Sequence, residues 1–131
     1  MDGTFRLEVH PEHLHLKFPS GFVLSAESTA EVWVAVAELS GQRGPRRVLI
    51  DLPEPDWQLD TMAAFESGRM LAEYTAGLSI AICLYDRDVD ELPVFFKTVA
   101  QNRGVKVEFF PDLASAHHWL DVDAGENAAG S

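Results

Sequence analysis

The chain has 131 residues, a length at which one domain buries roughly two-thirds of its unfolded surface in a single core. Its hydrophobic share of 47% and charged share of 24% are typical of a globular protein. The 10 basic and 21 acidic residues give a net charge of −11, which argues against nucleic acid and anionic membranes as partners, because both require clusters of lysine and arginine. The single cysteine, Cys83, excludes an internal disulfide and a cysteine-based metal site. We predict a cytoplasmic protein, since no apolar run approaches the roughly 20 residues of a membrane span.

Residues 5–18 are predicted to form an antiparallel hairpin. Apolar residues alternate with polar ones before and after a turn at Pro11-Glu12. This period of two directs one face of each strand toward a core and the other toward water. A short third strand is predicted over residues 22–24, and a first helix over residues 26–40 with Ser25 as its N-cap.

The main buried strand is predicted over residues 46–52, an apolar run that Pro53 closes. A second helix of about 60–76 follows, and then a second buried strand over residues 78–85. Gly68 lies in the middle of the apolar face of this helix, where glycine costs about 1 kcal/mol relative to alanine. We therefore expect a close approach between this helix and the sheet.

A third helix is predicted over about 90–103, followed by a strand and a short final helix that Asp112 caps. Strands that alternate with helices pair in parallel through right-handed crossovers. Residues 1–120 are therefore predicted to form one α/β domain with about four helices and a mixed sheet of four or five strands. The sheet combines the antiparallel N-terminal hairpin with parallel strands 46–52, 78–85 and 105–110. Residues 121–131 are predicted to be a disordered tail.

Three segments of the chain resemble the SpoIIAA-like, or STAS-like, domains, which are named for sulphate transporters and anti-sigma factor antagonists: VLIDL, SIAICLYD and FFKTVAQNRGVKVEFFPDLASAHHWL. The similarity covers about residues 13–120 and is greatest to small stand-alone bacterial members with no established activity. In the anti-sigma antagonists, an Asp-Ser-x-Gly motif opens a helix, and a partner kinase phosphorylates its serine. Asp60-Thr61-Met62-Ala63 stands at the matching place, with alanine instead of the glycine. The resemblance implies a non-enzymatic regulatory or protein-interaction module.

The candidate partner or switch residues are Trp57, Asp60 and Thr61. Trp57 is predicted to lie in the loop after the strand 46–52, where it either packs over the end of the sheet or anchors a partner. A phosphate on Thr61 would meet the free amides and the dipole of a helix N-terminus, although capping alone also explains Asp60 and Thr61. The partner is expected to be another protein or a second copy of the chain, as in a homodimer. The alternative function is a small-ligand or lipid-binding domain with an apolar pocket between sheet and helices.

Acidic residues follow the predicted parallel strands, and the carboxyl ends of such strands form the edge where α/β proteins bind ligands. These residues form a candidate acidic rim: Asp51, Asp56, Asp86 and Asp88. Most of the acids in this region also lie just before a predicted helix, where aspartate is favoured as a cap. We therefore predict no metal at the rim.

The polar face of the hairpin carries His10, His13 and His15. Two imidazoles on one strand face can hold zinc, but a site needs a third ligand, and only Glu8 or Glu12 is near in sequence. The alternative interpretation, a solvated edge face, is preferred. We predict no metal, no cofactor and no catalytic residue, because the sequence has no nucleophile elbow, no Cys–His pair by spacing and no phosphate-binding glycine loop.

Overall fold

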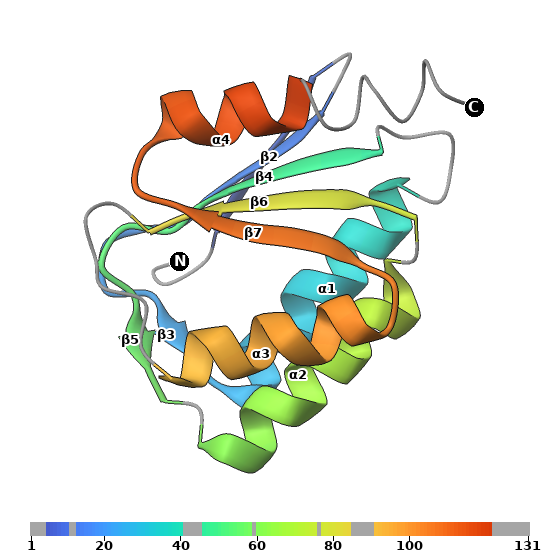
Figure 1. Cartoon of the computed structure of the whole chain (residues 1–131). Helices are drawn as coiled ribbons and strands as arrows, with labels where there is room; N and C mark the ends of the chain where they lie inside the picture. The colour runs from blue at the N-terminus through green and yellow to red at the C-terminus, as the bar shows by residue number, and fades with distance from the viewer. Residues whose placement is uncertain are drawn as a thin grey trace.

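A computed structural model describes residues 5–10, 13–40, 46–58, 60–75, 77–84 and 91–121, without the side chains of residues 40, 57 and 91–93. A five-stranded sheet lies between two helical layers, with α1, α2 and α3 on one face and α4 on the other (Figure 1). The predicted α/β class and mixed sheet are thereby confirmed. The predicted tail lies outside the described residues from residue 122 onward.

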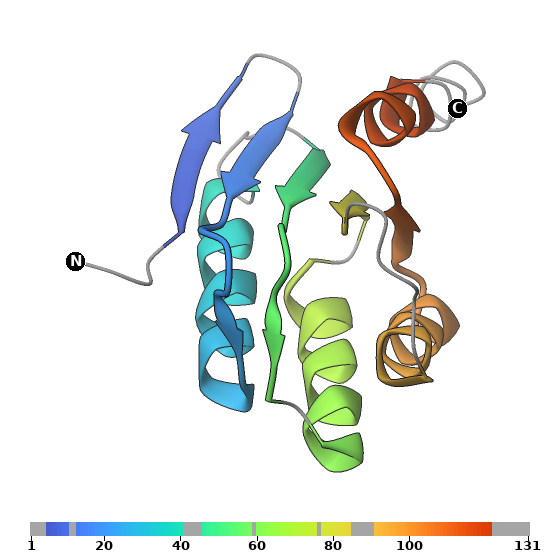
Figure 2. The ribbon, with the colours of Figure 1, turned by 90° about the vertical axis from the view of Figure 1, so that its left-hand side faces the viewer.

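The strands of the main sheet follow the order β1-β2-β4-β6-β7 (Figure 2). Only the β1–β2 pair is antiparallel, and every other neighbouring pair is parallel. The strands are β1 (Arg6–Val9), β2 (Leu14–Lys17), β4 (Arg47–Asp51), β6 (Ser79–Cys83) and β7 (Lys106–Phe110). All residues of β6 are buried, because this strand has neighbours on both sides and helices over both faces. That position explains why its sequence is continuously apolar instead of alternating.

The helices are α1 (Ala26–Ser40), α2 (Thr61–Tyr74), α3 (Glu91–Asn102) and α4 (Leu113–Trp119). Local side-chain bonds begin three of them. The Ser28 amide donates to Ser25 Oγ over 3.2 Å, and the Ser25 amide donates to Ser28 Oγ over 2.8 Å. Asp60 and Asp112 each accept a backbone N–H three residues ahead, as N-caps do. No helix within the described ranges is long and apolar enough to cross a membrane.

A second, two-stranded parallel sheet joins β3 (Val23–Leu24) to β5 (Asp56–Trp57). The short strand predicted over residues 22–24 therefore exists, but it pairs outside the main sheet. Trp57, predicted to lie in a loop, belongs to a strand. The reason is a pair of backbone bonds that hold the chain after β4, from Asp56 N to Phe22 O over 2.8 Å and from Gln58 N to Leu24 O over 2.9 Å.

Two hydrophobic cores flank the main sheet. The larger lies between the sheet and α1, α2 and α3, and the smaller lies under α4, where Leu49 and Ala81 meet Ala116 and Leu120. A Cβ on Gly68 would lie 2.9 Å from the carbonyl oxygen of Phe96 and 3.0 Å from Cβ of Val99. Both neighbours belong to α3, so the predicted approach of this glycine to the sheet is wrong. Gly68 is needed where α2 crosses α3.

Candidate functional site

The predicted switch residues lie at the start of α2. Asp60 is its N-cap, and one carboxylate oxygen accepts the Ala63 amide over 2.8 Å. The capping interpretation of Asp60 is thus confirmed. Thr61 is the first helical residue and is exposed. The backbone of Trp57 belongs to β5, and its side chain lies outside the described part of the structure.

The acidic residues of the predicted rim occupy different surroundings. Asp51 is the half-buried last residue of β4, whereas Asp56 lies exposed in β5 and accepts a hydrogen bond from Nε2 of the Gln58 side chain over 3.0 Å. Asp86 and Asp88 lie outside the described residues. Among the residues that are described, no three carboxylates come close enough together to hold a metal ion.

An apolar cavity of about 50 Å³ lies between the sheet and the helices α1, α2 and α3. Its lining includes Phe18, Leu24, Trp33, Ile50 and Phe96. Ligand pockets typically measure about 300–1,000 Å³. The cavity therefore does not favour an acyl chain or a comparable ligand at this place.

Three histidines gather at the end of the N-terminal hairpin, and the strand register explains why. Glu8 pairs with His15, and Val9 pairs with Leu14. The backbone bond from His10 N to His13 O, 2.9 Å long, extends the same register by one pair. Directly paired residues of antiparallel strands share a face. The register therefore places Glu8, His10, His13 and His15 on one side of the hairpin.

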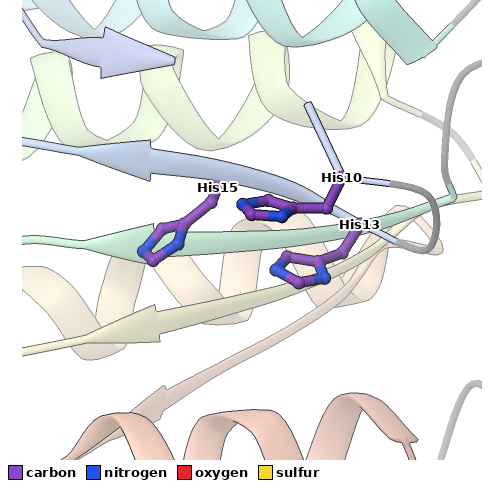
Figure 3. A group of neighbouring side chains, drawn as sticks. All are labelled: His10, His13 and His15. Atoms are coloured by element: carbon purple, nitrogen blue, oxygen red, sulfur yellow. The ribbon is translucent and has the colours of Figure 1, made fainter. Parts of the chain in front are cut away.

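That side is the face of the sheet that carries α4. His15 pairs with Leu49 across β2 and β4, and Leu49 belongs to the core beneath α4. Figure 3 shows the three imidazoles together on this side of the hairpin. His117, from α4 itself, meets the ring of His13 edge-on, with ring centroids 5.4 Å apart.

The three hairpin histidines each offer one ring nitrogen such that all three nitrogens lie within 4.8 Å of one another. The rings of His10 and His13 are stacked, with centroids 4.8 Å apart. In a tetrahedral zinc site with Zn–N bonds of 2.0–2.1 Å, ligand nitrogens lie about 3.3 Å apart. Metal binding would therefore require the side chains to rotate toward one another, and His10, with a side chain that is 42% exposed, is the least buried of the three.

His15 is the buried member of the group. Its residue is only 8% exposed, and its Nε2 has no hydrogen-bond partner within the described structure. A buried polar atom without a partner costs free energy, and a bound water or ion would supply the missing partner. The preferred sequence interpretation, a solvated edge face, is wrong for His15, because this residue is buried and that face of the sheet continues under α4.

Burial favours the neutral form of two of these imidazoles. Burial lowers the pKa of His13 below its usual 6.5, and the neighbouring charges of His10, His117 and His15 lower it further. Burial also lowers the pKa of His15, with Lys17 as the next cause. Neutral imidazole is the form that binds metal ions.

Glu8 supplies a carboxylate beside the group. Its Oε1 lies 3.2 Å from Nε2 of His10, and its Oε2 lies 3.5 Å from Nζ of Lys17. The hydrogen bond with His10, followed by the charge of Lys17, lowers the pKa of Glu8. A carboxylate bound to one ring nitrogen orients a ligand histidine and leaves its other nitrogen for the metal. Glu8 can thus serve as an outer partner of the site.

Comparison with known proteins adds no assignment. No protein-family model matches the chain, and no curated protein matches it significantly.

Proposed function

We propose that this domain binds one divalent transition-metal ion, with Zn²⁺ as the reference ion, through His10, His13 and His15. The observation that carries the proposal is the gathering of one ring nitrogen from each of three histidines within 4.8 Å of one another, with His15 buried among them. Three neutral imidazoles suit zinc, copper and nickel, whereas magnesium and calcium prefer oxygen ligands. Glu8 supports the set from outside.

In this proposal the ion is the signal that a non-enzymatic regulatory module reads. The resemblance to STAS-like domains favours a regulatory role, since the anti-sigma factor antagonists among them act by binding partners. The cavity of about 50 Å³ between sheet and helices supports a role without a small organic substrate at that place. The alternative of a lipid-binding domain receives no support from a cavity of this size.

The test is zinc titration of the chelator-treated chain by calorimetry. We expect one site per chain, a rise in melting temperature with zinc concentration, and loss of affinity by more than about 100-fold in His10→Ala and in His13→Ala. His118 is exposed and lies outside the group, so His118→Ala is the matched control and should bind like the parent chain. Absence of binding, or binding that these two variants leave unchanged, would overturn the proposal.

A second proposal concerns protein partners, and exposed apolar side chains on the helical layer favour it. Met62 is 67% exposed in the first turn of α2, and Val94 and Phe95 are exposed near the start of α3. These two helices pack against each other. We propose that this apolar surface, next to Thr61, binds a second copy of the chain.

The net charge of −11 repels two copies, so salt should strengthen their association by screening. Sedimentation velocity of the parent chain and of Met62→Ser/Phe95→Ser, at low and high salt, tests this. A dimer that grows with salt and disappears in the variant supports the proposal. A monomer at all salt concentrations contradicts it.

A further inference from the structure

We infer that the metal ion takes His117 as its fourth ligand and thereby fixes α4 against the N-terminal hairpin. This inference rests on the metal binding proposed above. His117 is far from the hairpin in sequence and belongs to a different element. With His117 as a ligand, the site would have four protein ligands and no open position.

The position of His117 carries the inference. Its ring meets that of His13 at 5.4 Å between centroids and at 82° between planes. The His13 ring also lies 4.8 Å from His10 and 6.1 Å from His15, so His13 is the one ring in contact with all the others. His117 is half-buried on α4, on the side of the helix that meets the hairpin. The ring nitrogens of His117 lie outside the group of three that come within 4.8 Å of one another, so this fourth ligand must turn toward the ion when the ion binds.

The ligand in the fourth position decides whether a zinc site is structural or open. Zinc sites with four protein ligands are structural, whereas sites with three protein ligands keep a position open for water or substrate. A fourth histidine would therefore close the site and remove the open position. The same bond would join two parts of the chain that meet at few other places.

The attachment of α4 makes such a bond consequential. This helix has 7 residues, and an isolated helix of that length is not stable in water. Ala116 and Leu120 anchor its inner face on Leu49 and Ala81, a much smaller core than the one on the other side of the sheet. A metal bond through His117 would add a tie at the opposite flank of the helix, toward β2. Metal binding would then control how firmly α4 is held.

His117→Ala and His118→Ala form a matched pair, because adjacent helical residues diverge by about 100° and the exposed His118 faces away from the cluster. With Zn²⁺ as the probe, we expect His117→Ala to weaken binding by about tenfold or more and His118→Ala to leave it unchanged. With Co²⁺ as the probe, we expect the visible spectrum to change from a four-coordinate to a five- or six-coordinate form in His117→Ala alone. The variant His117→Glu keeps a ligand of similar reach and should restore part of the affinity.

Hydrogen exchange measures directly how firmly α4 is held when zinc binds. Zinc should slow amide exchange across Leu113–Trp119 in the parent chain and in His118→Ala, but not in His117→Ala. Zinc binding that is equally tight in His117→Ala, or that leaves exchange in α4 unchanged, would overturn the inference while the three-histidine site stands. If the parent chain does not bind zinc, the proposed function fails with it.

Discussion

The indole Nε1 of Trp33 on α1 donates a hydrogen bond of 3.0 Å to Oγ of Ser67 on α2, and both residues are buried. Trp33 also stacks on Phe96 of α3, with ring centroids 5.9 Å apart. One side chain thus connects all three helices that cover the larger core. The bond lies beside the small apolar cavity, so its loss would leave a buried donor in apolar surroundings.

We expect Ser67→Ala to lower the free energy of unfolding by about 1–3 kcal/mol, because the indole N–H of Trp33 loses its acceptor. Urea unfolding at constant temperature measures this change. Thr29 lines the same cavity, but its hydroxyl bonds backbone carbonyl oxygens of its own helix. Thr29→Val is therefore the matched control and should cost less. Equal losses in both variants would show that the Trp33–Ser67 bond has no special weight.

Gly68→Ala should destabilise the domain although alanine is the better helix former. The helical preference favours alanine by about 1 kcal/mol, whereas overpacking typically costs about 1–3 kcal/mol. The new Cβ would meet backbone oxygen at Phe96, which cannot move aside as a flexible side chain can. We expect a net loss in urea unfolding.

A double-mutant cycle identifies the clash at Gly68. Cγ1 of Val99 lies 3.0 Å from the position of the added Cβ, and Val99→Ala removes this atom. The cost of Gly68→Ala should therefore be smaller in the Val99→Ala background. A Gly68→Ala variant as stable as the parent chain would show that α2 and α3 separate without cost.

Asp60→Ala should lower the free energy of unfolding by about 1 kcal/mol, since the Ala63 amide loses its cap. Asp60→Asn keeps an acceptor and should cost little. Thr61→Ala, at an exposed position, should change stability by less than about 0.5 kcal/mol. Thermal unfolding of the three variants separates the capping role of Asp60 from any role of Thr61 in partner binding. A large loss in Thr61→Ala would mean that Thr61 is structural.

Local sequence signals predict much of this fold. The continuous apolar runs identify β4 and β6 because central parallel strands are buried on both faces. The N-caps Ser25, Asp60 and Asp112 are predictable because each acts on an amide three residues ahead. These features need no knowledge of distant contacts.

Sequence patterns do not predict the features that depend on contacts between distant segments. A glycine on the apolar face of α2 predicts that another element packs closely against Gly68, but only the structure identifies that element as α3. The strand β5 exists because it meets β3, more than 30 residues earlier. The alternation of the hairpin already places His10, His13 and His15 on one face, but the burial of His15 is not visible in it. The contact of His117 with His13 leaves no signal in a single sequence.

Asp112 offers a final prediction, since this cap holds the helix that carries His117. Its carboxylate accepts the Ser115 amide over 2.7 Å, and this bond lowers the pKa of Asp112 below its usual 3.8. The folded state therefore favours the ionised carboxylate. Its contribution to stability is fully present above pH 3.8 and is lost as the pH falls below that value through the pKa of the folded state.

We expect amide exchange in α4 to accelerate as the pH falls through this window, after correction for the intrinsic pH dependence of exchange. Asp112→Asn keeps an acceptor but does not titrate, so its α4 should show a weaker dependence. Asp112→Ala should loosen α4 at neutral pH as well, because the cap is gone at every pH. If His117 is a ligand, the same Asp112→Ala variant should also bind zinc more weakly, although Asp112 does not belong to the histidine group. If Asp112→Ala loosens α4 but leaves the zinc affinity unchanged, α4 does not contribute to metal binding, and the inference that His117 is the fourth ligand is contradicted.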